Sequence, residues 1–264
     1  MAPDSEAENI VRIARSFVDA RRAGEALPDY PGDMPAALAQ AYAVQDAAIG
    51  LTARPVAGWK VGRINPPVEG TNRLAGPIFA DQVFVADGGT IAMEVFEDGF
   101  GAAEAEFLLR IGTTPDPAKA GYTIDEARAL IDAVHVGIEI ASSPFPGINE
   151  NGPGVTISDF GNNNGLIVGA AIDGWRDIDF DTWPVELSIE GEQAGAATTA
   201  TMLDGPFGAA RFLFELMAAR GIALSPGQWI STGAVTGVHP VRVGDRVEAK
   251  FDGRLTVDCV IKAR

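Results

Sequence analysis

The sequence predicts an α+β protein, in which a small helical N-terminal part (residues 1–55) lies on a larger mixed-strand body (residues 56–264). Two observations predict this division. Before Pro55, apolar residues recur at helical spacing in two stretches. After Pro55, short apolar runs alternate with Gly- and Pro-rich turns at intervals typical of strands. With 264 residues, 47% of them hydrophobic, the chain is long enough to bury a sizeable core.

The two N-terminal helices are expected at about residues 5–23 and 35–53. Both stretches place apolar side chains three and four positions apart, so each helix has one face to bury. Asp33, with Pro35 behind it, is a plausible start for the second helix, because proline is favoured in the first turn.

The body begins with a short apolar run punctuated by glycine, Val56 to Gly62, which we interpret as a strand. Near the other end of the sequence, residues 227–233 and 241–251 have the alternating pattern of hairpins. Short strands and turns fill most of the distance between them, so the body is expected to be rich in β-structure.

Three features interrupt the strand pattern. The segment Thr123–Ile–Asp–Glu126 is a capping box that predicts a helix through about Val134. A second helix is expected at residues 209–220, closed by Gly221. Residues 141–165 form a polar stretch rich in Gly, Pro and Asn, and a loop of this length is more often a functional cover than a plain connection.

Composition excludes several classes of function. A net charge of −16 argues against nucleic acid or an anionic membrane as a partner. Apolar runs stay below the length of about 18 residues that a membrane span needs. Met1 to Glu8 is acidic, unlike a secretory leader, and the single Cys259 favours a reducing cytoplasmic location. His135 and His239 are too few for a multi-histidine metal centre, and the familiar phosphate-binding loops are missing from the sequence.

Three glutamates are the strongest candidates for a site. Glu104 and Glu106 stand two residues apart among Ala, Phe and Leu, so on a strand both side chains point to the same face. Glu139 lies in a second apolar run, and a neighbouring strand would bring it to the same place. Buried charge of one sign requires neutralisation, which a hard divalent cation bound by oxygens provides. The alternative is a solvated acidic face.

Lys60 is the next candidate, because it stands between small and apolar neighbours in Gly58–Trp–Lys–Val–Gly62. Burial disfavours the charged form of lysine, which suits a group that transfers protons near neutral pH. The alternative is a lysine whose aliphatic part covers a strand edge while its charge stays in water. Asp81 could orient Lys60, or it could cap a turn.

These residues lie in motifs that resemble a known family. The sequence is similar to the 2-oxo-4-pentenoate hydratase and 4-oxalocrotonate decarboxylase family of the fumarylacetoacetate hydrolase superfamily, over nearly its whole length. The segments that carry the resemblance are Ala41–Asp46, Gly58–Gly62, Glu104–Phe107, Gly137–Ile140, Ser225–Gly233 and Pro240–Asp245. Each motif alone is weak, whereas their order and spacing together are specific for the superfamily.

The resemblance implies a fumarylacetoacetase-type core and a Mg²⁺ or Mn²⁺ ion held by Glu104, Glu106 and Glu139. It implies a metal-chelated small 2-oxo acid as substrate, with Lys60 in proton transfer. Ser231, Thr232 and Gly233 would bind the substrate carboxylate. The expected activity is that of a hydro-lyase converting a 2-oxo-enoate to a 4-hydroxy-2-oxo acid, in a homo-oligomer serving aromatic-compound catabolism.

The sequence departs from the family pattern at two places. In Ser158–Gly165, an asparagine, assigned as Asn163, stands where the family has a serine near the substrate. After the third acid, the family's Asp-Ser-Arg is replaced by Ser142–Ser–Pro144. We therefore expect residues 142–164 to cover the substrate and Asn163 to contact it, with its neighbours Asn162 and Asn164 as the alternatives.

Three other readings stay open at this point. The chain could decarboxylate a 2-oxo-enedioate, or cleave an acylpyruvate as a C–C hydrolase. It could also be a non-catalytic partner of an active relative. The hydrolase would need a strong base beside the substrate. The histidine on the strand face of Glu139, His135, lies about 13 Å away along an extended strand, which weakens this alternative.

Overall fold

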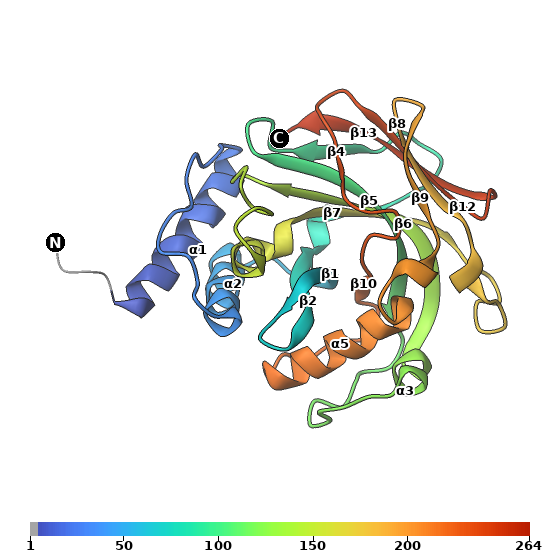
Figure 1. The fold of residues 1–264 in the computed structure, drawn as a ribbon, viewed down its shortest axis with the longest axis horizontal. Helices are drawn as coiled ribbons and strands as arrows, with labels where there is room; N and C mark the ends of the chain where they lie inside the picture. The colour runs from blue at the N-terminus through green and yellow to red at the C-terminus, as the bar shows by residue number, and fades with distance from the viewer. Residues whose placement is uncertain (1–4) are drawn as a thin grey trace.

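The computed structural model of the chain describes residues 5–264. Residues 1–4, which begin the segment considered above as a possible leader, lie outside the described part. Two β-sheets form the body, and five helices flank them (Figure 1). The α+β class predicted from the sequence is confirmed.

The larger sheet has eight strands and carries the candidate site residues. Its strands, in spatial order, are β2 (Thr71–Phe79), β1 (Val56–Val68), β10 (Trp229–Ser231), β5 (Phe100–Ile111), β6 (Ile131–Ser143), β7 (Asn163–Ala171) and β3 (Val83–Val85), with β11 (His239–Pro240) also paired to β5. Short β10 runs parallel to β1 and antiparallel to β5, so it joins the β1–β2 hairpin to the rest of the sheet.

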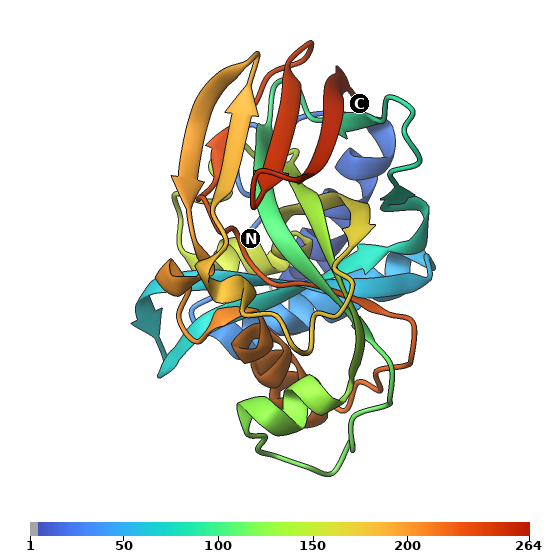
Figure 2. The same cartoon turned by 90° about the vertical axis from the view of Figure 1, so that its right-hand side faces the viewer.

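The second sheet has five strands and packs over the first, as the view in Figure 2 shows. Its strands, in spatial order, are β4 (Ala92–Val95), β13 (Leu255–Ala263), β12 (Arg246–Phe251), β8 (Val185–Ile189) and β9 (Glu192–Ala197). Side chains from the two sheets meet in one large apolar cluster, in which Phe107 of β5 contacts Phe251 of β12.

Five helices surround the sheets: α1 (Glu6–Ala23), α2 (Leu38–Thr52), α3 (Ile124–Ala129), α4 (Pro153–Ser158) and α5 (Gly205–Ala219). Four short 3₁₀ turns complete the chain: η1 (Ala80–Gln82), η2 (Phe160–Asn162), η3 (Phe180–Thr182) and η4 (Thr199–Thr201). Among the described residues, no helix is both long and apolar enough to span a bilayer.

The two N-terminal helices form close to where the sequence predicts them, but α2 begins at Leu38, with Ala37 as its N-cap, so the start expected at Asp33 and Pro35 is wrong. A capping box at Ser5 opens α1, and Gly24 in the left-handed conformation closes it. The first strand begins at Val56, as expected. Phe17 of α1 shares an apolar cluster with Phe160 of the body, so the helical part and the body bury surface against each other.

In the body, two helices were predicted with the wrong boundaries. The capping box at Thr123 is present, but its helix ends at Ala129, because the apolar residues that follow are buried in central strand β6. Helix α5 starts at Gly205, earlier than predicted, with Pro206 in its first turn.

The long polar stretch is also different from the loop that was expected. It consists of the end of β6, helix α4, turn η2 and the start of β7, and much of it is buried. Its polar side chains are buried because they are hydrogen-bonded: Ser142 Oγ donates to Phe100 O, and Asn164 Nδ2 donates to Glu94 O at 2.7 Å.

Candidate active site

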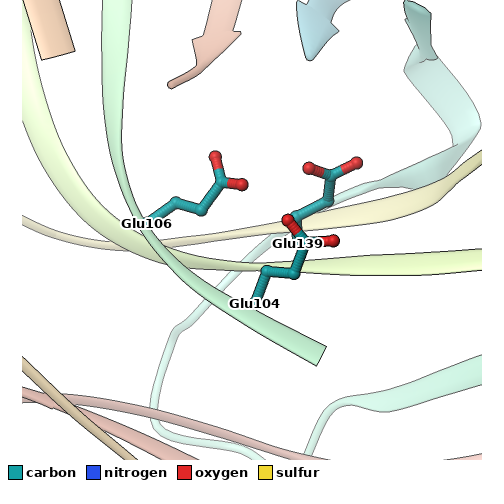
Figure 3. A group of neighbouring side chains, drawn as sticks. All are labelled: Glu104, Glu106 and Glu139. Carbon is teal, nitrogen blue, oxygen red and sulfur yellow. The ribbon is translucent and has the colours of Figure 1, made fainter. Parts of the chain in front are cut away.

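The register of two neighbouring strands brings the three glutamates together. In the antiparallel pair β5–β6, Glu104 lies directly opposite Glu139, and Glu106 lies opposite Gly137. Because strand side chains alternate, all three carboxylates point to the same face. Each offers an oxygen within 4.8 Å of the others, and Figure 3 shows them converging.

The carboxylates are buried without enough donors to satisfy them. Glu106 and Glu139 are 0% exposed, and within residues 5–264 neither Glu106 Oε1 nor Glu139 Oε2 has a hydrogen-bond partner. Buried polar atoms are normally paired, so these orphan oxygens require an explanation. Three converging carboxylates with free oxygens fit a hard divalent cation such as Mg²⁺ or Mn²⁺.

Without a cation, the cluster holds protons tightly. Burial, together with the negative charge of Glu139 and Glu104, raises the pKa of Glu106 well above its ordinary value. Burial likewise raises the pKa of Glu104 to about 7, although the nearby Lys60 partly offsets the effect. A cation that neutralises this charge therefore displaces protons as it binds.

Lys60 completes the cluster from β1. Its Nζ lies 3.4 Å from Glu139 Oε1 and donates a hydrogen bond to Asn162 Oδ1 at 3.2 Å. Burial alone would lower the pKa of Lys60, but the three carboxylates, with Glu139 the strongest, raise it above its ordinary value. Without a bound cation, the three carboxylates therefore favour the ammonium form of Lys60.

Asp81 lies away from this cluster. It stands in the first turn of η1, where its largely exposed carboxylate forms an ion pair with Arg54 at 2.6 Å. The proposed orienting role is corrected: Glu139 and Asn162 hold the Lys60 ammonium. Sequence reasoning missed this because the partners of Lys60 lie on β6 and η2, far along the chain.

The end of β10 and the residues that follow it contact the carboxylates directly. Ser231 Oγ donates to Glu106 Oε2 at 2.5 Å, and the backbone N–H of Gly233 donates to the same oxygen at 2.9 Å. Thr232 Oγ1 donates to Phe107 O. Thr232 and Gly233 also line the cavity described below, whereas Ser231 is fully buried behind it.

The three asparagines of the polar stretch have different partners. Asn163 Nδ2 donates to Glu139 Oε1 at 2.9 Å, so Asn163 orients a carboxylate of the cluster. Asn162 is the one that lines the cavity and contacts Lys60. Asn164 is hydrogen-bonded to Arg21 and Gln82. The asparagine that lines the cavity is therefore Asn162, one position before Asn163.

A cavity of about 830 Å³ opens onto the cluster, within the usual size range for small-molecule sites. Lys60 and Glu104 line it, and so does the edge of β1 beyond Lys60, which β10 no longer covers. The polar stretch contributes Asn149 and Asn162, consistent with the expected covering position. Arg63, which the sequence analysis did not single out, lines the cavity with an exposed side chain.

Comparisons with known proteins agree with this geometry, although no family model matches the sequence. The chain is 26% identical over 137 residues to 4-oxalocrotonate decarboxylase from Pseudomonas sp. strain CF600, and the match spans about half of each protein (52% and 52%). In structure it is similar to 4-oxalocrotonate decarboxylase from Pseudomonas putida G7 complexed with magnesium and adipate. That likeness has a TM-score of 0.81, with 20% identity, and covers 98% of this chain and 99% of the other.

A second solved structure extends the likeness. Fumarylpyruvate hydrolase from Pseudomonas aeruginosa, in complex with Mn²⁺ and pyruvate, aligns with a TM-score of 0.58 and 16% identity, over 80% of this chain and 91% of that one. The chain is thus similar, in part of its sequence and in its fold, to proteins of the fumarylacetoacetate hydrolase superfamily. The resemblance expected from the motifs is confirmed, and this chain has a three-carboxylate cluster in the core of that fold.

Proposed function

We propose that this protein is a divalent-metal-dependent lyase that acts on a small unsaturated 2-oxo acid. One observation carries the proposal: a buried cluster of three carboxylates, with a lysine ammonium 3.4 Å from one of them, at the wall of a cavity of small-molecule size. A purely structural cluster would have its oxygens satisfied by donors, and those of Glu106 and Glu139 are not, within the described residues.

Glu104, Glu106 and Glu139 would hold the cation, with Asn163 and Ser231 orienting two of these carboxylates through hydrogen bonds. When bound, the cation supplies a Lewis acid that stabilises the negative charge of an enolate. The relatives support Mg²⁺ or Mn²⁺, since their solved structures contain magnesium or manganese.

Lys60 acts as the proton donor in this proposal. Its ammonium lines the cavity beside Glu104, with Nζ 3.4 Å from Glu139 Oε1. It can therefore deliver a proton to a carbanionic carbon of a substrate in the cavity. Asn162 holds the ammonium in place, and Thr232 and Gly233 line the cavity beside it, although Thr232 Oγ1 and the Gly233 N–H already donate to Phe107 O and Glu106 Oε2.

Decarboxylation of a 2-oxo-enedioate is the reaction that this arrangement supports best. The bond to the distal carboxylate breaks and releases CO₂, and its electron pair passes through the C=C bond to the 2-oxo group. Lys60 then protonates the resulting dienolate. These steps need an acid and no base, and Glu104 is the only carboxylate among the described residues that line the cavity. The curated relative is a 4-oxalocrotonate decarboxylase, which favours the same reaction.

Hydration of a 2-oxo-enoate, placed first by the sequence analysis, is the second candidate. It uses the same cluster and the same acid, but it also needs a group that activates water. C–C hydrolysis has that requirement too, and His135 is turned instead toward Gly169 O and the Trp229 ring. A cytoplasmic location and a homo-oligomer stay predictions.

A panel of 2-oxo acids, assayed with Mg²⁺ and with EDTA, tests the proposal. Release of CO₂ from a 2-oxo-enedioate supports decarboxylation, whereas a hydroxy acid product supports hydration. The variant Glu106→Gln should lose both Mg²⁺ binding, measured by calorimetry, and turnover. Exposed Glu97 is the matched control, and Glu97→Gln should keep both. Absence of Mg²⁺-dependent turnover across the panel would contradict the proposal and favour a non-catalytic partner.

A further inference from the structure

The segment that presents Asn162 to Lys60 has an unfavourable backbone. Phe160, Gly161 and Asn162 all lie in the left-handed region, with φ of 55°, 64° and 58°. For L-residues this conformation brings Cβ close to the following carbonyl, so glycine adopts it freely and asparagine tolerates it, whereas Phe160 is unfavourable there. Backbone of this kind persists only where its surroundings hold it, and it is common at functional sites.

The left-handed turn packs against β1, which carries Lys60, and against the neighbouring strand β2. A Cβ at Gly161 would lie 3.1 Å from Lys60 Cδ, and a Cβ at Gly76 would lie 2.0 Å from Phe160 O. Asn162 Oδ1 accepts the hydrogen bond from Lys60 Nζ at 3.2 Å, and Asn162 Nδ2 donates to Asn149 Oδ1. The conformation of the turn thus determines where the Lys60 ammonium is held.

One arginine from the first helix binds both ends of this turn. Arg21 donates to Asp159 through Nε at 2.5 Å and Nη2 at 2.8 Å, a bidentate pair at the residue before the turn. Its Nη1 donates to Asn164 Oδ1 at 3.0 Å, two residues after the turn. The guanidinium carbon also lies 5.3 Å from the Phe160 ring centroid. Both charged groups are buried, with Arg21 6% and Asp159 0% exposed.

We infer that Arg21 is a positioning residue for Lys60: through Asp159 it holds the left-handed turn that places Asn162 against the ammonium. This inference rests on the proposed role of Lys60 as the proton donor. The competing explanation is that the Arg21–Asp159 pair only stabilises the fold. The two explanations differ in whether the effect of Arg21 passes through Asn162.

A double-mutant cycle with Arg21→Lys and Asn162→Ala separates them. Lysine keeps the charge opposite Asp159 but cannot make the bidentate pair together with the bond to Asn164. If Arg21 acts through Asn162, each single variant should lower kcat about tenfold or more, with KM and Mg²⁺ affinity little changed. The double variant should then be no slower than Asn162→Ala alone. If the two losses in kcat multiply in the double variant, or if Arg21→Lys keeps the wild-type kcat, the inference is overturned.

A readout that needs no turnover keeps this test separate from the proposed function. Lys60 is 4% exposed, whereas the other native lysines, Lys119, Lys250 and Lys262, are more accessible and serve as internal standards. In pulsed acetylation followed by mass spectrometry, Arg21→Lys should raise the labelling of Lys60 several-fold and leave the standards unchanged. Asn162→Ala should raise it as much, and the double variant no further. Unchanged Lys60 labelling would refute the positioning role even if no substrate were found.

The control must be an arginine of equal burial elsewhere. Arg220, near the end of α5, has a 9% exposed side chain and donates to Asp46 and Gln45 on α2. Arg220→Lys should lower the melting temperature without raising Lys60 labelling. If Arg21→Lys fails to fold, Asp159→Asn removes the same ion pair with a smaller change and replaces it in both measurements. Equal Lys60 labelling in the Arg220 and Arg21 variants would point to general destabilisation and overturn the inference.

Discussion

Replacing Glu104 by glutamine should stabilise the protein when no cation is present. Glu104 has an ordinary pKa of 4.5 that rises to about 7 in the folded chain, chiefly through burial. A raised carboxyl pKa means that the folded state binds the proton more tightly, so stability is full below about pH 4.5 and falls as the pH rises toward 7. The rise in pKa from 4.5 to about 7, at about 1.36 kcal/mol per pKa unit, lowers the free energy of unfolding by about 3 kcal/mol near pH 8. Glutamine cannot ionise and avoids this loss.

Thermal unfolding in EDTA measures the effect. For a chain of this size, about 3 kcal/mol corresponds to a rise in melting temperature of roughly 6 °C for Glu104→Gln at pH 8. At pH 5, where the carboxyl group is largely protonated, the rise should nearly vanish. In the presence of Mg²⁺ the wild type should have the higher melting temperature, because only the wild type keeps all three carboxylates and is fully stabilised by binding the cation. Exposed Glu97, changed to glutamine, should show no effect at either pH.

Two results would refute this reasoning. A Glu104→Gln variant that is less stable than the wild type in EDTA at pH 8 would mean that the carboxylate is already neutralised within the folded chain. An equal change at pH 5 and pH 8 would mean that packing, and not ionisation, decides the outcome.

Three further predictions follow from the same contacts. Lys60→Ala should lower kcat by about 10² or more and leave Mg²⁺ affinity, measured by calorimetry, intact or increased, because it removes a cation beside Glu139; wild-type turnover would reduce Lys60 to a packing residue. Asn163→Ser should weaken Mg²⁺ binding by about tenfold or more, since it loses the hydrogen bond to Glu139 Oε1, and an unchanged binding isotherm would contradict that role. Cys259 is buried and its thiol pKa is raised to about 12 by burial, so a thiol reagent at pH 8 should react only after denaturation; rapid reaction of the native protein would disagree.

The pair Glu104 and Glu106 of the carboxylate cluster could be predicted from the sequence, because the two residues are neighbours on one strand. The period of a strand places Glu104 and Glu106 on one face, and their apolar flanks indicate burial. The position of Glu139 depended on strand pairing, and the resemblance to a family supplied what periodicity could not. Lys60 was found by the same contrast between a charged residue and its apolar neighbours.

The errors concern contacts between distant parts of the chain. Asp81 was assigned to Lys60, but Arg54, 27 positions away, binds it at the surface. The sequence could not decide among the three asparagines, because the left-handed turn at Phe160–Asn162 gives each side chain a different partner. The composition of residues 141–165 predicts an exposed loop. Much of the segment is buried instead, because its polar side chains find hydrogen-bond partners elsewhere in the fold, which composition does not reveal.

The arginine of the first helix has a consequence for the order in which the protein folds. Its partners Ser142, Asp159 and Asn164 follow it by 121, 138 and 143 positions, and Arg264, which donates to its backbone oxygen, by 243. Contacts of such sequence separation carry a high loop-closure cost and form late. During synthesis the first helix emerges long before Asp159, so the counter-charge of Arg21 is not yet available when that helix forms. We therefore expect the arrangement around Lys60 to form late in folding.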